Sequence, residues 1–373
     1  LGDVYKRQVD EICKSLASIA PAVDFIRVGS ELSCDEAYRG HLIENELSSC
    51  NRRSEVYERI RNCRIIVGTV AAISGKPELF RLKHFDVAII DEATQILEPQ
   101  LLGILCARGE DGKDAIDKFV LIGDHKQLPA VVQQNTEQSA IYDESLLSIG
   151  LTNLKDSLFE RLYRNCTATV HRSYDMLCRQ GRMHPEVALF ANRAFYGGRL
   201  IPVGLPHQIE SSDTICRLAF YPSVPEKAGA SAKINYSEAR IVADLAVRIY
   251  EDHQTDFDES RTLGIITPYR SQIALIKKEI ESLGIPALNR ILVDTVERFQ
   301  GSERDVIIYS FCVNYPYQLK FLSNLTEEEG VLIDRKLNVA LTRARKQMFI
   351  TGVPELLERN PLYKSLLKLI ESF

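Results

Sequence analysis

The chain has 373 residues, a length that favours two domains of ordinary size with room for a short insertion. Hydrophobic residues make up 45% and charged residues 26%, close to the averages of globular proteins, and no apolar run is long enough to cross a bilayer, so the composition excludes a membrane protein. The formal net charge of −5 excludes a strongly basic nucleic-acid-binding domain. A cleft can still gather local basic groups and backbone amides around a bound strand.

The nine cysteines are scattered along the chain without a C-x-x-C pair. This spacing argues against a zinc site or a disulfide framework and favours a reducing, intracellular compartment, the cytoplasm or the nucleus. Residues 1–8 (LGDVYKRQ) carry no periodic pattern, and we interpret them as a non-native leader before a helical pattern that begins near Val9. The following apolar stretch contains Lys14 and lacks a basic leader, so it does not predict a signal peptide.

Six short apolar runs end abruptly in polar residues and are followed by helical patterns. They span residues 64–67, 87–90, 119–122, 263–266, 306–311 and 348–351. This arrangement is typical of buried parallel strands joined by crossover helices, so the sequence predicts an α/β fold with a parallel sheet in each half.

Segments rich in proline, glycine and acids predict surface loops at residues 108–114, 200–207 and 222–230. A helical pattern at 157–163 precedes a stretch at 165–170 that we interpret as the boundary between the halves. The expected domains are therefore residues 9–165 and residues 166–373.

Two adjacent acids, Asp91 and Glu92, follow the apolar run at 87–90 in the segment DEATQ. Open α/β sheets bind their ligands at the carboxyl ends of their strands. There Asp91 can hold a magnesium ion through water, and Glu92 can position or deprotonate the water that attacks a γ-phosphate. The plain alternative is an acidic first turn of the next helix, where carboxylates suit the helix dipole.

The run at 119–122 ends in a second polar cluster, GDHKQLP at 123–129, and we expect its strand to lie beside the first. An amide such as Gln127 can hydrogen-bond a γ-phosphate oxygen or the attacking water, and so report the nucleotide state to a neighbouring domain. The alternative is a polar turn closed by Pro129, in which His125 serves a structural purpose.

Arginines stand out in two segments of the second half, QGRMHP at 180–185 and LNVALTRAR at 337–345. Arg182 and Arg343 can each present a guanidinium group to phosphate. Its planar and permanently charged fork stabilises a transferring phosphoryl group, an effect worth roughly a thousandfold or more in rate. The alternative is that Arg343 and Arg345 decorate a solvated helix face.

Two polar segments between these arginines also follow strand-like runs. In DTVERFQGSERD at 294–305, Thr295 and backbone amides can contact the phosphates of a strand, and Glu303 can accept hydrogen bonds from a nucleotide ribose. The alternative there is a charged β-turn. In TPYRSQ at 267–272, Tyr269 and its neighbours can contact nucleic acid or cap the next helix.

Taken in this order, the segments resemble the motifs of superfamily 1B helicases, the Upf-like and Dna-two-like group that contains RNA-surveillance and Okazaki-fragment-processing enzymes. The matching segments are residues 91–95 for motif II, 123–129 for motif III, 182–185 for motif IV, 293–305 for motif V and 337–345 for motif VI. The resemblance covers most of the chain from Val9 onward.

This resemblance implies two RecA-like domains of the P-loop NTPase helicase core, which clamp ATP and Mg²⁺ between them and bind a single strand of DNA or RNA across both. It implies a monomeric motor that moves 5′-to-3′ and unwinds duplexes. By match to family positions, Gln127, Arg182 and Arg343 would contact the γ-phosphate and Glu303 the ribose. Thr69 and Thr295 would contact the phosphates of the strand.

Two departures from the family pattern concern the nucleotide. The family usually has a tyrosine that stacks on adenine before the motif IV arginine, but Gly181 stands here. The chain contains no G-x-x-x-x-G-K-[ST] phosphate-binding loop, and Gly75-Lys76 fails as one because Val70 replaces the first glycine and Pro77 offers neither amide nor hydroxyl. We therefore expect an incomplete first domain, a loop upstream of residue 1, and no activity of this chain alone.

Two other functions fit the same motifs. One is an ATP-driven translocase or nucleic-acid-processing subunit that never unwinds duplex, which the sequence does not separate from a helicase. The other is a non-hydrolysing scaffold that keeps the fold and binds a strand or a protein passively. The presence of Asp91, Glu92, Arg182 and Arg343 favours hydrolysis in the intact protein.

Overall fold

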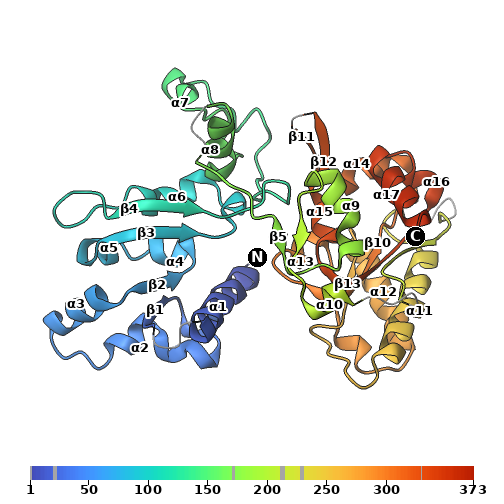
Figure 1. Ribbon diagram of the computed structural model, residues 1–373, viewed down its shortest axis with the longest axis horizontal. Helices are drawn as coiled ribbons and strands as arrows, with labels where there is room; N and C mark the ends of the chain where they lie inside the picture. The colour runs from blue at the N-terminus through green and yellow to red at the C-terminus, as the bar shows by residue number, and fades with distance from the viewer. Residues whose placement is uncertain (1, 20–22, 170–172, 211–214, 227–230, 329) are drawn as a thin grey trace. The chain divides into compact units, whose positions relative to one another are not determined.

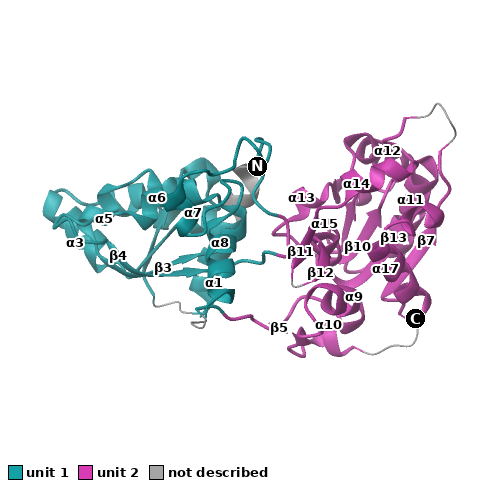
Figure 2. Ribbon diagram, turned by 90° about the horizontal axis from the view of Figure 1, so that it is seen from above, with its two compact units in different colours: residues 1–125, 129–174 teal, residues 126–128, 175–373 magenta. Residues whose placement is uncertain are grey.

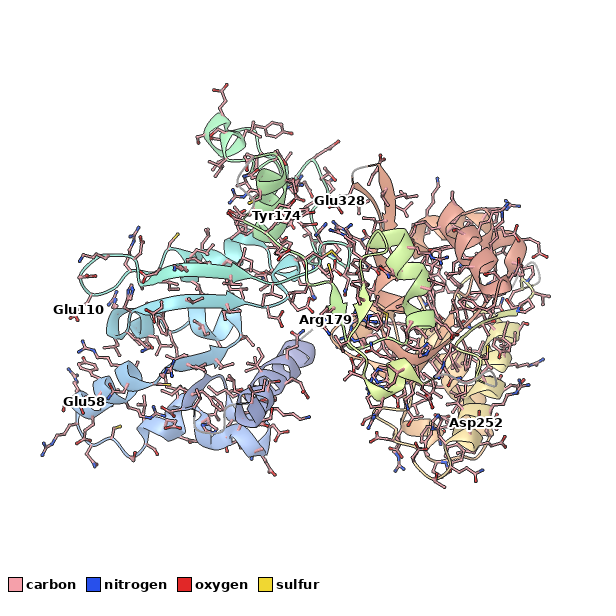
Figure 3. All side chains as sticks on the ribbon, viewed as in Figure 1. Glu58, Glu110, Tyr174, Arg179, Asp252 and Glu328 are labelled. Atoms are coloured by element: carbon pink, nitrogen blue, oxygen red, sulfur yellow. The ribbon has the colours of Figure 1, made fainter. Side chains whose placement is uncertain are left out.

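The computed structural model describes residues 2–19, 23–169, 173–210, 215–226, 231–328 and 330–373. The chain divides into two compact units, coloured separately in Figure 2. Unit 1 comprises Leu1–His125 and Pro129–Tyr174, and unit 2 comprises Lys126–Leu128 and Asp175–Phe373. The final passage of the chain into unit 2 lies between Tyr174 and Arg179, both labelled in Figure 3. The boundary expected at 165–170 precedes it, and Val170 lies outside the described residues.

Unit 1 alternates strands with short helices, as Figure 1 shows. Its elements are α1 (Gly2–Ile19), β1 (Phe25–Val28), α2 (Ile43–Leu47), α3 (Arg53–Asn62), β2 (Ile65–Gly68), α4 (Val70–Ser74), α5 (Glu78–Leu82), β3 (Phe85–Ile90), α6 (Glu98–Leu105), β4 (Ile116–Leu121), α7 (Glu144–Ser148) and α8 (Leu158–Thr167). Residues 2–8 of the expected leader belong to α1. The helix predicted at 157–163 is α8, which begins with a capping box between Ser157 and Glu160.

The strands of unit 1 form two parallel pairs, β1 with β2 and β3 with β4. The second pair is covered unevenly. Ala88 and Phe119 pack into apolar clusters on one face, whereas Val87, Ile89 and Val120 are exposed. Because successive side chains of a strand point to opposite faces, these three exposed residues share one face of the pair.

Unit 2 contains the remaining elements. They are β5 (Arg179–Gln180), α9 (Pro185–Phe195), β6 (Ile201–Pro202), α10 (Pro206–Ile209), β7 (Leu218–Pro222), α11 (Tyr236–Asp252), β8 (Leu263–Ile266), α12 (Arg270–Ser282), β9 (Leu292–Asp294), α13 (Val296–Phe299), β10 (Arg304–Ser310), α14 (Leu319–Leu322), β11 (Leu325–Glu328), β12 (Val331–Asp334), α15 (Arg335–Leu341), β13 (Ala344–Gly352), α16 (Pro354–Leu357) and α17 (Pro361–Glu371).

A five-stranded parallel sheet in the order β7-β13-β10-β8-β9 forms the centre of unit 2. Alternate residues of β10 enter two separate cores. Ile307 and Tyr309 pack with residues of α9, α15 and α17, while Val306 and Ile308 pack with residues of α11 and α12. Both faces of the sheet are therefore covered by helices, as expected for parallel strands that read as continuous apolar runs.

The predicted α/β fold with parallel strands in each half is confirmed, and each of the six apolar runs lies in or overlaps a strand.

The loop prediction is wrong in part for residues 200–207, which contain β6 and the first turn of α10. That segment pairs because the Ile201 amide donates to the Cys178 carbonyl at 2.8 Å. The loop predicted at 222–230 is described only to residue 226. Among the described helices, none is both long and apolar enough to span a membrane.

Candidate nucleotide and nucleic-acid site

The two predicted acids of unit 1 stand directly after β3. Asp91 is exposed and Glu92 is partly buried. Glu92 has a left-handed backbone with φ 52°, a conformation that few residues other than glycine adopt, and its amide donates to Asp91 Oδ1 at 2.9 Å. The Gln95 side chain donates to the Glu92 carboxylate. The chain therefore turns sharply after the strand, at the two acids.

The second polar cluster lies beside the first, as predicted, because β4 pairs with β3. The Ala93 amide donates to the Ile122 carbonyl at 2.8 Å. Gly123 passes so close that a Cβ there would lie 2.9 Å from Cγ2 of Thr94, which explains glycine at this position. The His125 ring packs against the Tyr163 ring at a tilt of 30°, with centroids 4.4 Å apart, in keeping with a structural histidine.

Residues 126–128 of the same cluster pack into unit 2. The Lys126 ammonium donates to the Phe195 carbonyl at 2.9 Å, and the Lys126 carbonyl accepts from the Asn338 side chain at 2.8 Å. Leu128 is buried in the same core as residues of α9, α15 and α17. Gln127 is thereby held among the residues of unit 2, although the strand that leads to it belongs to unit 1.

Gln127, Arg343, Arg182 and Glu303 come together within unit 2. Arg343 is 2% exposed, and its Nη2 donates to Oε1 of Gln127 at 3.1 Å. Its Nε donates to the Val339 carbonyl at 3.2 Å, which fixes the guanidinium plane. Arg182 is more accessible and pairs with Glu303 at 2.7 Å, while its Nη1 donates to the carbonyl next to Arg343 at 3.3 Å. The alternative in which Arg343 decorates a solvated helix face is wrong because its side chain is buried.

Charge at this cluster is predominantly positive. Arg345 adds a third guanidinium, 3.5 Å from Glu303 and 3.3 Å from the buried Asp305. Arg182 and Arg345 both pair with Glu303, and arginine forks match phosphate oxygens in both charge and geometry. The cluster can therefore take a polyanionic phosphate, provided that the partly exposed Arg182–Glu303 pair exchanges, which costs little at an accessible position.

The three residues predicted to contact nucleic acid lie at the ends of strands or beginnings of helices. Thr69 caps α4 in unit 1, and its hydroxyl oxygen accepts from the Ala72 amide at 3.1 Å. Thr295 precedes α13 and makes no side-chain cap there. The hydroxyl of the partly buried Tyr269 accepts from the Gln318 side chain at 3.1 Å. Thr295 and Tyr269 lie in unit 2, at the carboxyl ends of the neighbouring strands β9 and β8.

A cavity of about 560 Å³ in unit 1 contains none of the predicted site residues, and Lys76 lies at its wall. Gly75 ends α4, and the Lys76 ammonium pairs with Glu44 at 3.1 Å, so this dipeptide forms a helix end and not a phosphate loop. Among the residues that the structure describes, no group of three or more metal-ligating side chains occurs.

Several residues that hold the site were not predicted from the sequence. Asn338 is fully buried and donates to both Lys126 and Tyr196, although it lies in an otherwise apolar helix. An amide inside the segment LNVAL was the signal that could have identified it. Glu238 and Asn314 were also missed, and they belong to a buried polar network beyond the end of β10.

Comparison with known proteins gives the family. Residues 154–355 match a family described as AAA domain, and residues 41–135 match a second family with the same description. The chain is 30% identical to the DNA replication ATP-dependent helicase/nuclease DNA2 of Xenopus laevis, covering 81% of this chain and 28% of that protein. It is also 30% identical to the Probable helicase MAGATAMA 3 of Arabidopsis thaliana, covering 82% of this chain and 35% of that protein.

A third relative is the DNA polymerase alpha-associated DNA helicase A of Saccharomyces cerevisiae, 28% identical over 82% of this chain and 44% of that protein. The chain thus spans less than half the length of each of these curated relatives. The first family match alone covers more than half of the chain and includes the segments of Arg182, Glu303 and Arg343. The protein therefore belongs to the AAA domain family and, with these relatives, to the superfamily 1 helicases of the DNA2-like and Upf-like group.

Proposed function

We propose that the intact protein is an ATP-dependent helicase that couples ATP hydrolysis to 5′-to-3′ movement along single-stranded DNA or RNA and to unwinding. The observation that carries this proposal is the convergence of Gln127, Arg182, Arg343 and Glu303 within unit 2. These residues come from four separate segments, and all four segments occur in the order of the family's motifs. We further propose that the motor acts as a monomer in the cytoplasm or nucleus.

The contacts of the cluster suggest how it responds to nucleotide. Arg343 donates to the amide oxygen of Gln127, and a γ-phosphate oxygen is a stronger acceptor for the same guanidinium. An arriving phosphate would therefore compete for Arg343 and leave the Gln127 amide to bind the phosphate or the attacking water. Glu303, once released from Arg182, can accept from the ribose hydroxyls.

The acids of unit 1 supply the other part of the proposed chemistry. Asp91 would hold Mg²⁺, through water, and Mg²⁺ would neutralise charge on the phosphates. Glu92 would orient or deprotonate the attacking water. No phosphate-binding loop occurs in residues 1–373, and we propose that such a loop, supplied by sequence outside them, completes the nucleotide site.

Nucleic-acid-stimulated ATPase and strand-separation assays of the full-length protein test the proposal. We expect hydrolysis that rises with single-stranded oligonucleotide, and separation of a duplex that carries a 5′ overhang but not one that carries a 3′ overhang. The 373-residue chain alone should show negligible hydrolysis. Stimulated hydrolysis by the isolated chain would contradict the proposed need for an additional loop.

The two alternative functions give different results in the same assays. A translocase would hydrolyse ATP with strand and displace a protein block from it, yet leave duplexes intact. A passive scaffold would bind strand and show no hydrolysis even at full length. Either result would replace the helicase proposal.

A further inference from the structure

The carboxyl end of β10 leads into a segment, residues 311–322, that exposes large aromatic side chains. Tyr317 is 54% exposed and Phe321 is 68% exposed. The rings of Tyr315 and Tyr317 stack with centroids 5.8 Å apart and planes 14° apart. In the short helix α14, Leu319 and Leu322 are buried and anchor the turn. Phe321 lies between these two buried leucines and projects from the surface. Packing does not require an aromatic side chain at this exposed position.

A buried polar network holds this segment in place. The Asn314 side chain donates to the Ile234 carbonyl at 2.7 Å, and its oxygen accepts from the Asn235 side chain at 2.9 Å. Gln318 accepts from the Asn314 amide at 2.9 Å and donates to the Ala232 carbonyl at 2.7 Å. Satisfied networks of this kind rigidify and specify one conformation. The exposed rings are therefore presented on a fixed support.

Hydrogen bonds and an ion pair connect the segment that carries the rings to both residues of unit 2 that the sequence predicts to contact nucleic acid. Gln318, next to Tyr317, bonds the Tyr269 hydroxyl. Lys336 donates to the Phe321 carbonyl at 3.4 Å and pairs with Glu297 at 3.2 Å, two residues beyond Thr295. Because β10, β8 and β9 are parallel neighbours, their carboxyl ends share one edge of the sheet. Figure 2 shows α13 and α14, which follow β9 and β10, in the same part of unit 2.

Each of these three strand ends also carries an exposed basic residue, Arg270, Arg298 and Lys320. In the part of the chain that the structure describes, no ion pair neutralises any of the three. Unpaired basic groups interleaved with exposed aromatic rings are the combination that binds single strands without sequence preference, since phosphates take the charges and bases stack on the rings.

We propose that Tyr317 and Phe321 form a stacking platform for unpaired bases of a single-stranded nucleic acid, beside the phosphate contact proposed for Thr295. This inference rests on the proposed function, because it assigns a base subsite to the same strand-binding edge. Stacking on tyrosine and phenylalanine needs only the face of a base, so the platform would accept any sequence.

Fluorescence anisotropy of a labelled oligo-dT strand with the full-length protein tests the platform. Tyr317→Ala and Phe321→Ala should each weaken binding by roughly five- to a hundredfold, the range of one lost base stack. Phe321→Trp should retain affinity. Tyr142→Ala is the matched control, since Tyr142 is 81% exposed but lies in unit 1, and it should leave affinity unchanged.

A strand of equal length with abasic sites separates stacking from other effects. The unsubstituted protein should bind the abasic strand more weakly than oligo-dT, whereas the double variant Tyr317→Ala, Phe321→Ala should bind the two alike. The dependence of affinity on salt should not change, because no phosphate contact is removed. Equal loss on both strands would overturn the platform, as would a double variant that binds oligo-dT normally.

The same assay distinguishes failure of the platform from failure of the proposed function. If Thr295→Ala weakens binding to both strands while the ring variants have no effect, the strand-binding edge stands and the platform falls. If the unsubstituted protein binds neither strand, the proposed function falls, and the platform falls with it.

Discussion

Strand β10 of unit 2 and strand β3 of unit 1 both adjoin predicted site residues, since Glu303 precedes β10 and Asp91 follows β3, but their surroundings differ. Ile307 and Ile308 of β10 are fully buried on opposite faces of a five-stranded sheet. On β3, Val87 is 45% and Ile89 is 67% exposed, and among the described strands β3 pairs with β4 alone. The arginine cluster of unit 2 is therefore supported by a sheet whose central strands are covered on both faces, whereas the two acids of unit 1 follow a strand pair with an open apolar face.

This difference shows which predicted site residues are held by a fully covered sheet within the described chain. Parallel strands are normally buried on both faces, and an open apolar face marks a surface that another element is suited to cover. The positions of Arg182 and Arg343 follow from packing within unit 2. The positions of Asp91 and Glu92 depend on a pair of strands that lacks cover on one side in the described residues.

The largest expected effect concerns the acid side. In the full-length protein, Glu92→Gln should reduce ATP turnover by a thousandfold or so while sparing ATP binding, because an amide can hold a water but cannot take its proton. Single-turnover hydrolysis and nucleotide-binding assays measure the two properties separately. The matched control is Glu110→Gln, an exposed residue of the same unit that is labelled in Figure 3. A Glu92→Gln protein with near-normal turnover would remove Glu92 from the chemistry.

On the arginine side, Arg182→Ala should lower kcat by roughly a thousandfold, the usual value of a guanidinium on a transferring phosphoryl group. Arg182 is partly exposed, so the melting temperature should change little. Arg179→Ala is the matched control, because Arg179 is exposed and nearby in the chain. An unchanged kcat, or a loss explained by unfolding of unit 2, would contradict the proposed role.

These two halves also differ in how well the sequence predicts them. The strand runs and the polar residues that follow them could be located because parallel strands are apolar and end at the ligand edge of a sheet. That rule predicts that β3 lies beside β4. It therefore also predicts that Asp91 and the cluster at 123–129 lie at the same end of this strand pair. The association of Gln127 with unit 2 could not, because a contact between distant segments leaves no local pattern.

The buried side chains around the site were equally hidden. The sequence leaves a solvated position open for Arg343, because arginine is rarely buried, and its burial depends on carbonyl partners such as Val339 that no sequence pattern reveals. Glu238 lies on the buried, otherwise apolar face of α11, where the sequence alone gives no reason for a carboxylate. Its partners follow β7 and end β10, segments far away in the chain.

A matched pair of isoleucines tests the comparison of the sheets directly. Ile308→Ala should lower the free energy of unfolding of unit 2 by about 2–5 kcal/mol, because it leaves a cavity in a fully buried core. Ile89→Ala should change that of unit 1 by only about 0.5 kcal/mol. Urea unfolding followed by amide hydrogen exchange in β10 and β3 resolves the two units. Similar losses would show that β3 is as well covered as β10.

The last expected effect is a pH dependence confined to unit 2. Glu238 is fully buried, and its carboxylate accepts from the Ser310 hydroxyl at 2.6 Å and from the Cys312 amide at 2.8 Å. Burial raises the pKa of Glu238 from 4.5 to about 7 against the opposing effect of these hydrogen bonds. Because the folded state holds the proton more tightly, this group stabilises unit 2 fully below about pH 4.5 and loses that contribution as the pH rises toward 7.

At about 1.4 kcal/mol per pKa unit, the loss is on the order of 3 kcal/mol across this range. Glu238→Gln removes the titrating proton and keeps an acceptor for the amide of Cys312, whose left-handed backbone, φ 49°, needs that bond. The unfolding free energy of this variant, measured by hydrogen exchange of β10 amides, should therefore fall less between pH 5 and pH 7.5 than that of the unsubstituted protein. Other carboxyl groups, including the buried Asp334, titrate in both proteins and cancel in the difference. Parallel pH profiles would mean that the Glu238 carboxyl titrates near its ordinary pKa despite its burial.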